Sequence, residues 1–513
     1  MSTDNSNLGR YAGWSREQLV ARLTQLDNQA EHLPVLQPRA SKKPFDFSRY
    51  PRRKIALKFC YSGWDYSGLA FQLGPTPLPT VENVLFDVLA RTHLVDPEAA
   101  FDGCGWEKCG RTDRGVSAGG QVVSLWVRSA LTSSDREPSS ERPAGEESTS
   151  KSGLNHLDDE FLSLALSENT SIPPKSSKSA HEHDYVAMLN RLLPDTIRVI
   201  AWSPVSDTFS ARFSCKYRHY KYFFSSTQLD PSLMQAAAER LLGEHDFQNL
   251  CKVDAQKQIT SFKRKILRAS ITPLDADEGG AEGMYVFDLV GTAFLYHQVR
   301  HIMAVLFLVG TGLEPISSVS QLMNSEEDAE QPYGDETYIP LNRKPEYQMA
   351  DALPLMLWEC GYDESELDWR INGRPTSVDG SEKAYSNLCH ELECIYNRSQ
   401  VYTVLNRHFL KAARKHHPIP NYQLPLKSGF KDLKTGQGRR GGAETLMNIP
   451  LGGGTFKRTH QYIPLLERKR LDTVEVINER YRLGRGQRLK ELEEAAGKTT
   501  AHELRVNSDD GDE

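Results

Sequence analysis

The sequence predicts an α+β fold in which two α/β halves face one cleft and are followed by a helical and basic extension. The 513 residues are 39% hydrophobic, which is enough for two domain-sized cores. Short β-rich runs alternate with amphipathic helical patterns on both sides of a Ser-rich stretch. Between Val401 and Lys490, 19 Lys and Arg stand against 6 Asp and Glu, although the whole chain carries −6. This end of the chain is therefore suited to binding phosphates.

Composition and periodicity divide the chain into six parts. Residues 129 to 178 hold 13 Ser among 50 residues. A segment of this composition has too few apolar groups to offset the entropy lost on ordering. The expected parts are an N-terminal helix and linker (1–53), a first α/β half (54–128), a disordered Ser-rich insertion (129–180), a second α/β half (181–362), a helical and basic extension (363–490) and an acidic tail (491–513).

The elements of the first half follow from local patterns. Ser15 and Gln18 have the spacing of a capping box before the N-terminal helix. Residues 55–61 are β-rich, and Thr80 precedes an apolar pattern of helical period. A second strand at 121–127 then completes a β-α-β pattern.

The second half again mixes strands and helices. A helix is expected from Pro231, because proline is favoured in the first turn of a helix. The most apolar segment of the chain predicts another helix, from about Tyr296 to Val309. The other expected elements are a helix at 185–193 and strands at 197–202, 217–224, 262–272 and 284–290.

The extension combines helical and glycine-rich patterns. A helix is expected within 383–414, and a shorter one at 474–481. Gly452 to Gly454 have no flanking strand pattern, so we read them as a flexible linker.

Several classes of protein are excluded by composition. The longest apolar run has eight residues, whereas a membrane-spanning helix needs about 20, and the first ten residues lack the pattern of a secretory signal. Eight cysteines in this length indicate free thiols in a reducing compartment. Neither the Cys104/Cys109 pair nor the Cys389/His390/Cys394 group has the spacing of a zinc site. No metal site and no phosphate-binding nucleotide loop is expected.

The string CGRTDRGVSA at 109–118 is the first candidate for chemistry. It places Asp113 between two arginines and close to Gly115. Neighbouring positive charge favours an ionised carboxylate, which can act as a nucleophile or a base. The alternative is an aspartate that only caps a turn.

Two further strings combine aromatic and basic residues. ARFSCKYRHYKYFF at 211–224 alternates rings and cations, a mixture suited to stacking on bases while cations meet phosphates. By strand alternation Arg218, Tyr220 and Tyr222 share one face, and an ordinary half-buried strand is the alternative. In FLYHQVRH at 294–301, His297 and Arg300 stand three residues apart before the apolar helix, so both can line one wall of a cleft. The alternative is a solvated arginine at the start of a helix.

Together these strings resemble the TruA-type tRNA pseudouridine synthases, and among them the eukaryotic branch that acts on tRNA positions 38 and 39. The first strand and turn, YSGWDYSGLAFQ at 61–72, and the closing segment, YIPLLERKR at 462–470, are also similar to that family. The landmarks extend from residue 55 to residue 481. Gln298 and the string PLML at 354–357 depart from the pattern of bacterial members.

The resemblance implies a role for each matching residue. Asp113 would be the catalytic carboxylate and Arg300 its partner. Arg111 would insert into the RNA near the flipped target, and Tyr220 would pack on the target base. In the basic closing segment, Arg468, Lys469 and Arg470 are the candidates for gripping the tRNA backbone.

The resemblance also implies a mainly antiparallel sheet around a central catalytic cleft and an isomerase that needs no cofactor. Uridine would become pseudouridine in the anticodon stem-loop of tRNA through base flipping. Two alternatives stay open: a synthase for other tRNA positions and a non-catalytic tRNA-binding protein. We expect tRNA as partner, no membrane, and a location in the nucleus and the cytoplasm. The sequence leaves a homodimer open.

Overall fold

The structure is a computed structural model that describes residues 45–72, 74–131, 181–275, 283–325, 330–332, 334–373, 387–418, 424 and 447–488. The chain divides into two compact units, Met1–Arg49 and Tyr50–Glu513. Of the first unit the structure describes five residues, with the 3-10 helix η2 (Phe47–Arg49). The predicted N-terminal helix and acidic tail, and nearly all of the Ser-rich insertion, lie outside the described residues. The second unit holds all other described residues.

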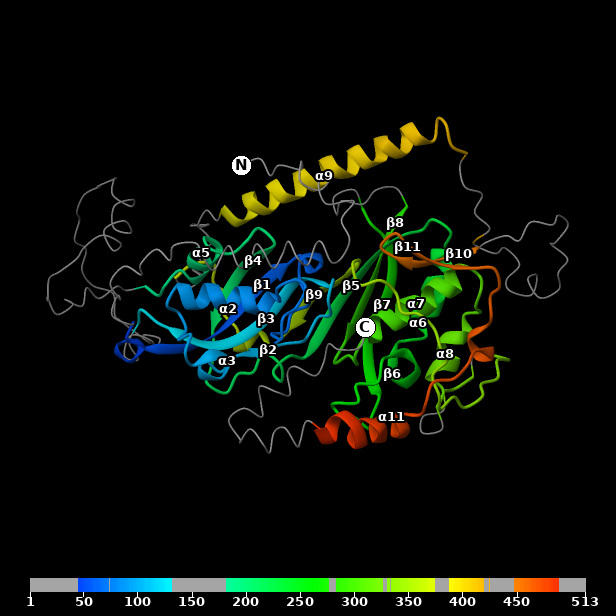
Figure 1. Cartoon of the computed structure of the whole chain (residues 1–513), viewed down its shortest axis with the longest axis horizontal. Helices are drawn as coiled ribbons and strands as arrows, with labels where there is room; N and C mark the ends of the chain where they lie inside the picture. The colour runs from blue at the N-terminus through cyan, green and yellow to red at the C-terminus, as the bar shows by residue number, and fades with distance from the viewer. Residues whose placement is uncertain are drawn as a thin grey trace, which may run out of the picture. The chain divides into compact units, whose positions relative to one another are not determined.

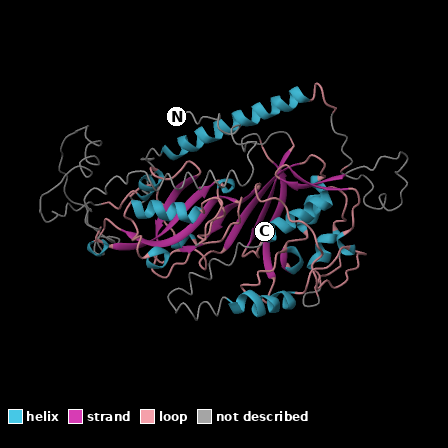
Figure 2. Ribbon diagram, viewed as in Figure 1, coloured by secondary structure: helices cyan, strands magenta, loops and turns pink. Residues whose placement is uncertain are grey.

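One nine-stranded sheet runs through this unit (Figure 2). Its order is β4-β1-β3-β9-β5-β8-β7-β6, and β2 pairs with β3 beside this path. The strands are β1 (Arg52–Tyr61), β2 (Glu107–Lys108), β3 (Ser117–Arg128), β4 (Ile197–Pro204), β5 (Tyr217–Ser225), β6 (Gly243–Asp246), β7 (Lys263–Pro273), β8 (Met284–Gly291) and β9 (Leu355–Gly361).

Helices accompany each half of the sheet (Figure 1). The first half carries α2 (Val81–Arg91), α3 (Ala100–Gly103) and α5 (Tyr185–Asn190), and the second carries α6 (Pro231–Glu239), α7 (Gln298–Gly310) and α8 (Ser317–Met323). The sequence analysis assigned 185–202 to the second half, but β4 pairs with β1, so α5 and β4 complete the first half of the sheet. Thr80 caps α2 as predicted, since its hydroxyl accepts the Asn83 N–H. Every residue of α7 is buried. Within the described ranges, no helix has the length and apolar character needed to cross a bilayer.

The two halves of the sheet meet at β9. Ser117 and Ala118 of β3 pair with Met356 and Leu357 of β9 in a short parallel ladder, and β9 pairs antiparallel with β5. All other strand pairs are antiparallel, which confirms the predicted mainly antiparallel sheet. The predicted β-α-β unit is wrong in one respect: β1 and β3 run antiparallel, whereas that unit has parallel strands.

The extension holds a second, two-stranded sheet. Strands β10 (Met447–Gly452) and β11 (Thr455–Thr459) form a hairpin. The prediction of a flexible linker at Gly452 to Gly454 is wrong, because these residues make the turn of this hairpin with φ angles of +89°, +59° and +80°. Glycine adopts such angles without a steric penalty.

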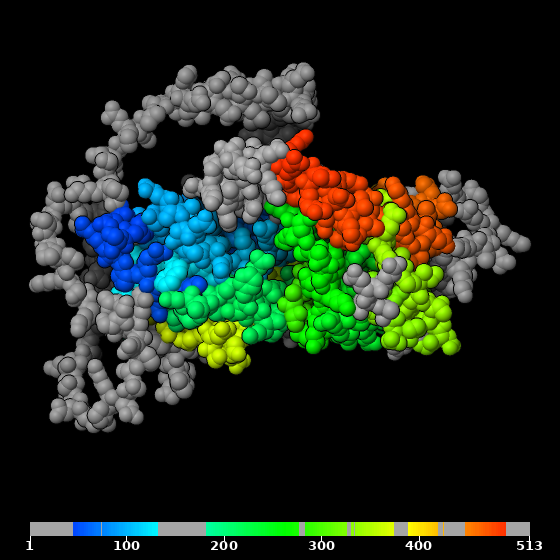
Figure 3. All heavy atoms as spheres, turned by 90° about the horizontal axis from the view of Figure 1, so that it is seen from below, coloured from blue at the N-terminus to red at the C-terminus, as the bar shows by residue number. Residues whose placement is uncertain are grey.

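The last part of the extension, residues 447–488, packs on the second half, and Figure 3 shows its red and orange segments against the green one. The earlier part contacts β4 of the first half, through Arg370 and Glu391. Glu314, after α7, is buried. Its Oε1 accepts the Tyr462 hydroxyl at 2.5 Å and the Leu465 N–H at 2.7 Å. The Asp351 N–H donates to the Leu451 carbonyl of β10 at 2.8 Å. Since Tyr462 and Leu465 are themselves buried, this part of the extension belongs to the common core.

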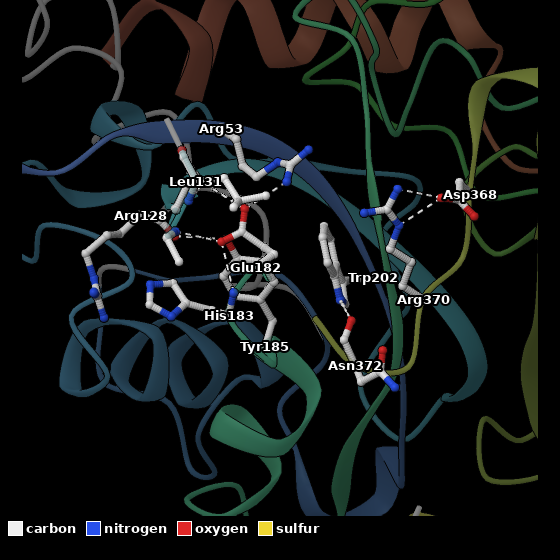
Figure 4. A network of polar contacts seen from close by, with 12 residues as sticks. Arg53, Arg128, Leu131, Glu182, His183, Tyr185, Trp202, Asp368, Arg370 and Asn372 are labelled. Atoms are coloured by element: carbon white, nitrogen blue, oxygen red, sulfur yellow. Dashed lines mark hydrogen bonds and ion pairs between the residues drawn. The ribbon is translucent and has the colours of Figure 1, made fainter. Parts of the chain in front are cut away.

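A buried carboxylate holds together the two ends that flank the Ser-rich insertion (Figure 4). Glu182 accepts hydrogen bonds from the Ser129 hydroxyl and the Ala130 N–H, each at 2.7 Å, and pairs with Arg53 at 2.8 Å. Burial alone would raise the pKa of Glu182, but these donors lower it below its ordinary value. Ser129 to Leu131 thus continue the ordered first half, and residues 132–180 lie outside the described ones.

Candidate active site

The loop that precedes β3 fixes the position of Asp113. Thr112 is buried, its hydroxyl lies 2.6 Å from the Tyr61 hydroxyl, and its carbonyl accepts the Leu69 N–H at 3.2 Å. The Asp113 carbonyl accepts the Val116 N–H at 3.1 Å, which closes a turn. The backbone of the loop is therefore held on both sides of Asp113, whose side chain stays 23% exposed.

Two basic side chains from the start of α7 contact the Asp113 carboxylate. His297 Nε2 lies 3.3 Å and Arg300 Nη1 lies 3.9 Å from Asp113 Oδ2. The Arg300 Nε donates to the Ala350 carbonyl at 2.8 Å, which fixes the guanidinium. The expected contact between Arg300 and Asp113 is present. Partial positive charge at the N-terminus of a helix adds to the same electrostatic field.

His297 is the residue whose contact with Asp113 was missed by the sequence analysis, which placed it only on a cleft wall. It precedes the first turn of α7 with φ +56°, in the left-handed region. A non-glycine residue rarely adopts this conformation, and such residues concentrate at functional sites. Its ring is packed on Tyr296, with centroids 3.8 Å apart. Nothing in the sequence around His297 predicts a left-handed backbone there, because the residue is not a glycine and stands directly before a helix.

Tyr220 lies on β5 beside this cluster. It is buried, and its ring packs edge-on against Phe294 with centroids 5.0 Å apart. Burial raises its pKa strongly, and the Asp113 carboxylate is one of the negative groups that add to this effect. The phenol therefore stays protonated at neutral pH. Tyr220 thus belongs to the environment of Asp113, and little of its ring is open to solvent; its packing on the target base stays a prediction.

Arg218 joins three segments around the loop. Its Nη2 donates to the Cys109 carbonyl at 2.9 Å and to the Arg212 carbonyl at 3.1 Å. Its Nη1 donates to the Thr292 carbonyl at 3.0 Å. Cys109 begins the loop that carries Asp113, and Thr292 precedes the segment that carries His297. Arg218 therefore ties both sides of the site to β5, a role that strand alternation alone did not reveal.

The other predicted RNA-binding residues are found in two places. Arg111 is exposed next to Thr112 in the loop itself. The closing segment contains the short helix η8 (Leu465–Glu467), and its Lys469 is exposed. Arg468 donates to the Ile463 carbonyl at 2.8 Å, and Arg470 donates to the Leu466 carbonyl at 2.7 Å. Both arginines thus stabilise their own segment, which leaves Lys469 as the most available cation of the three.

Thiols gather behind the loop. Cys109, Cys215 and Cys360 are free and adjacent, and hydrogen bonds from the other two thiols, with the charge of Arg218, lower the pKa of Cys109. Across the described ranges, no group of three or more His, Cys, Asp or Glu is arranged to hold a metal ion. A small pocket between α7 and β10 is lined by Leu308 and Ile449, among others, and does not include Asp113.

Comparison with known proteins identifies relatives of one kind. Residues 237–363 match the family described as tRNA pseudouridine synthase. The chain is 35% identical over 494 residues to the tRNA pseudouridine(38/39) synthase of Saccharomyces cerevisiae, covering 92% of this chain and 91% of the relative. It is 32% identical to the human protein of the same name, covering 75% and 74%. With the tRNA pseudouridine synthase A of Methanothrix thermoacetophila it shares 29% identity, over 62% and 85%.

Proposed function

Given that the chain belongs to the tRNA pseudouridine synthases, we propose that it isomerises uridine to pseudouridine at positions 38 and 39, in the anticodon stem-loop of tRNA. The positions come from the names of the yeast and human relatives. The observation that carries the chemistry is the partly exposed Asp113 carboxylate, held against His297 and Arg300 where the two halves of the sheet meet.

The reaction needs one well-placed carboxylate. The bond between N1 of the base and C1′ of the ribose breaks, the base rotates, and a bond from C5 to C1′ forms. C5 loses a proton and N1 gains one, so the change is neither a hydrolysis nor a net oxidation. Asp113 can act on the ribose as a nucleophile or remove a ribose proton. Arg300 and His297 hold the carboxylate in place during either course.

The surroundings of Asp113 suit a base that has left its stack. A base to be rotated must be flipped out of the helix, and an aromatic ring commonly receives it. We assign this role to Tyr220, whose pKa is affected by the Asp113 carboxylate. We also assign the exposed Arg111 to the space that the base vacates.

The test is Asp113→Asn, which keeps the size and removes the charge. We expect product formation to fall by at least roughly 1,000-fold, or about 4 kcal/mol of barrier, while tRNA binding persists because phosphate contacts supply most of the affinity. Product and binding are measured separately. Asp87→Asn on α2, where the side chain is exposed, is the matched control. Undiminished product from Asp113→Asn would refute the assignment.

The alternatives give different outcomes in the same assays. A non-catalytic tRNA-binding protein would yield no pseudouridine even as wild type. A synthase for other positions would yield pseudouridine outside 38 and 39. Mapping modified sites in tRNA from cells that lack the protein separates all three.

Location and oligomeric state complete the proposal. The nucleus and the cytoplasm are where tRNA is made and used, so we place the activity in both.

A homodimer is supported by the long helix α9 (Asn387–Ala413), on which Tyr402 and Phe409 expose their rings. A second copy of the chain is suited to cover them.

A further inference from the structure

We infer that the turn at Arg212 and Phe213 is a stacking platform for an unpaired nucleotide of the tRNA beside the flipped uridine. This inference deepens the proposed function and rests on it. It adds a specific contact outside the Asp113 cluster.

Phe213 is unusually open. Its exposed fraction is 79%, the largest among the exposed large hydrophobic residues that the structure describes. Burial of a phenylalanine side chain ordinarily stabilises a fold, and Phe213 forgoes this stabilisation in the free protein. The guanidinium of Arg212 lies 5.3 Å from the centre of the ring. A ring and a cation placed together in solvent match a base and its phosphate.

The turn that carries this pair is rigidly held. The Ala211 N–H donates to the buried Ser124 hydroxyl at 3.2 Å, and the Ala211 carbonyl accepts the Tyr362 hydroxyl at 2.6 Å. The Phe213 N–H donates to the Ser210 hydroxyl at 3.1 Å. A mobile loop would lose conformational entropy on binding, whereas a prearranged ring loses little. The exposure of Phe213 is thus built into the fold.

The platform lies beside the loop of Asp113. The Arg212 and Cys109 carbonyls share one donor, Nη2 of Arg218, at 3.1 and 2.9 Å. Through this shared donor, the turn that carries Phe213 is tied to the start of the loop that carries Asp113.

Charge favours RNA over a protein partner. The exposed side chains on the turn and the loop are mainly cationic: Arg111, Arg114, Arg212 and Lys216. When the target base leaves its stack, the adjacent base loses a stacking neighbour, and an aromatic side chain can replace it. Every base has a face that can stack, so this contact adds affinity with little sequence preference.

The experiment compares three variants at one position. Phe213→Ala and Phe213→Leu should each weaken tRNA binding and raise KM by about tenfold, within the range known for base–aromatic stacking. Phe213→Trp should bind like wild type, because it keeps a flat ring. Ile339→Ala, at a residue that is 74% exposed on another segment, should change neither quantity. Fluorescence of 2-aminopurine placed next to the target uridine should be quenched by wild type and Trp alone.

Three results would contradict the stacking role of Phe213. Unchanged binding by Phe213→Ala, or full binding by Phe213→Leu, would overturn the platform. So would a Trp variant as weak as Ala, with folding confirmed by thermal unfolding. Pseudouridine formed by wild type in the same reactions tests the proposed function separately, so the two failures are distinguishable.

Discussion

Next to Arg300, which contacts Asp113, α7 carries another buried basic residue, His301. It lies against Lys344, whose Nζ is 3.0 Å from His301 Nε2 and donates to the Cys251 carbonyl at 2.6 Å. Burial lowers the pKa of Lys344 to about 7, and the nearby charge of Lys252 adds to this effect. Burial also lowers the pKa of His301, as does Lys344. Protonation of His301 and Lys344 is thus disfavoured in the interior next to the site.

A pH-dependent stability follows from Lys344. The ordinary lysine pKa is 10.5, so above about pH 7 the unfolded chain binds more protons at this residue than the folded chain does. The free energy of unfolding contributed by Lys344 therefore rises with pH above 7, by at most about 1.36 kcal/mol per pH unit. Lys344→Met should remove this slope. Urea unfolding at intervals between pH 7 and 9 measures it.

The control is Lys265→Met, at an exposed position of β7, which should leave the slope unchanged. The window stops at pH 9 because burial raises the pKa of the Cys251 thiol to about 12, and this thiol then contributes a slope of opposite sign. An equal slope in wild type and Lys344→Met would mean that Lys344 is charged in the folded protein.

At the scale of elements, local signals predicted whatever depends on local chemistry. The helix at Val474–Tyr481 begins and ends where its apolar period does, and Thr80 starts α2. β9 was missed, because its string, beginning at Leu355, is short and its partners lie in distant segments. The hairpin turn at Gly452 was misread, since a run of glycines is equally typical of a linker. Pairing direction and long-range contacts, such as His297 with Asp113, are not encoded locally.

The contacts of Glu182 indicate where the Ser-rich insertion can be removed without loss of the fold. Because Glu182 contacts Ser129 and Ala130, the ends of segment 132–180 lie close together. Replacing 132–180 by a short Gly-Ser linker should leave turnover within about twofold of wild type, since loop closure depends weakly on length. Product formation and thermal unfolding measure the outcome.

A longer deletion, 129–178, supplies the comparison. It removes two of the donors to a fully buried carboxylate, and an unsatisfied buried group costs roughly 1–3 kcal/mol. The longer deletion should therefore unfold at a lower temperature than the shorter one. A large loss of activity in a folded 132–180 deletion would show that the insertion contacts tRNA or completes the site.

At the scale of the molecule, the basic extension and the site are connected. The Glu346 N–H donates to the Lys469 carbonyl at 2.9 Å, and the Leu471 N–H donates to the Lys344 carbonyl at 2.8 Å. A few residues further along, the Ala350 carbonyl accepts Arg300. Segment 344–350 thus connects the closing segment, where we propose that tRNA binds, to Arg300, the partner of Asp113.

The triple variant with Ala at 468, 469 and 470 tests the proposed contact of these three side chains with the tRNA backbone. Each lost phosphate contact should flatten the plot of log affinity against log salt by about 0.9 or less, so we expect roughly two to three units if all three cations touch phosphates. Lys469→Ala alone should account for up to one unit and leave the fold intact, because its side chain is exposed. Single-turnover chemistry at saturating protein should persist.

Arg91→Ala, an exposed arginine on α2, is the control for nonspecific loss of charge. An unchanged salt slope in the triple variant would assign Arg468 and Arg470 to the structural role that their bonds to backbone carbonyls already describe.

The position of β9 has a consequence for how the protein is made. β3 is synthesised early, yet its neighbour across the seam of the sheet begins at Leu355. Until that residue has left the ribosome, β3 and β5 each present an unpaired edge, and such edges are prone to association with other chains. The nascent first half is therefore an incomplete sheet during the synthesis of more than 200 residues between Ala118 and Leu355. Arg300, the partner of Asp113, is also synthesised within that interval.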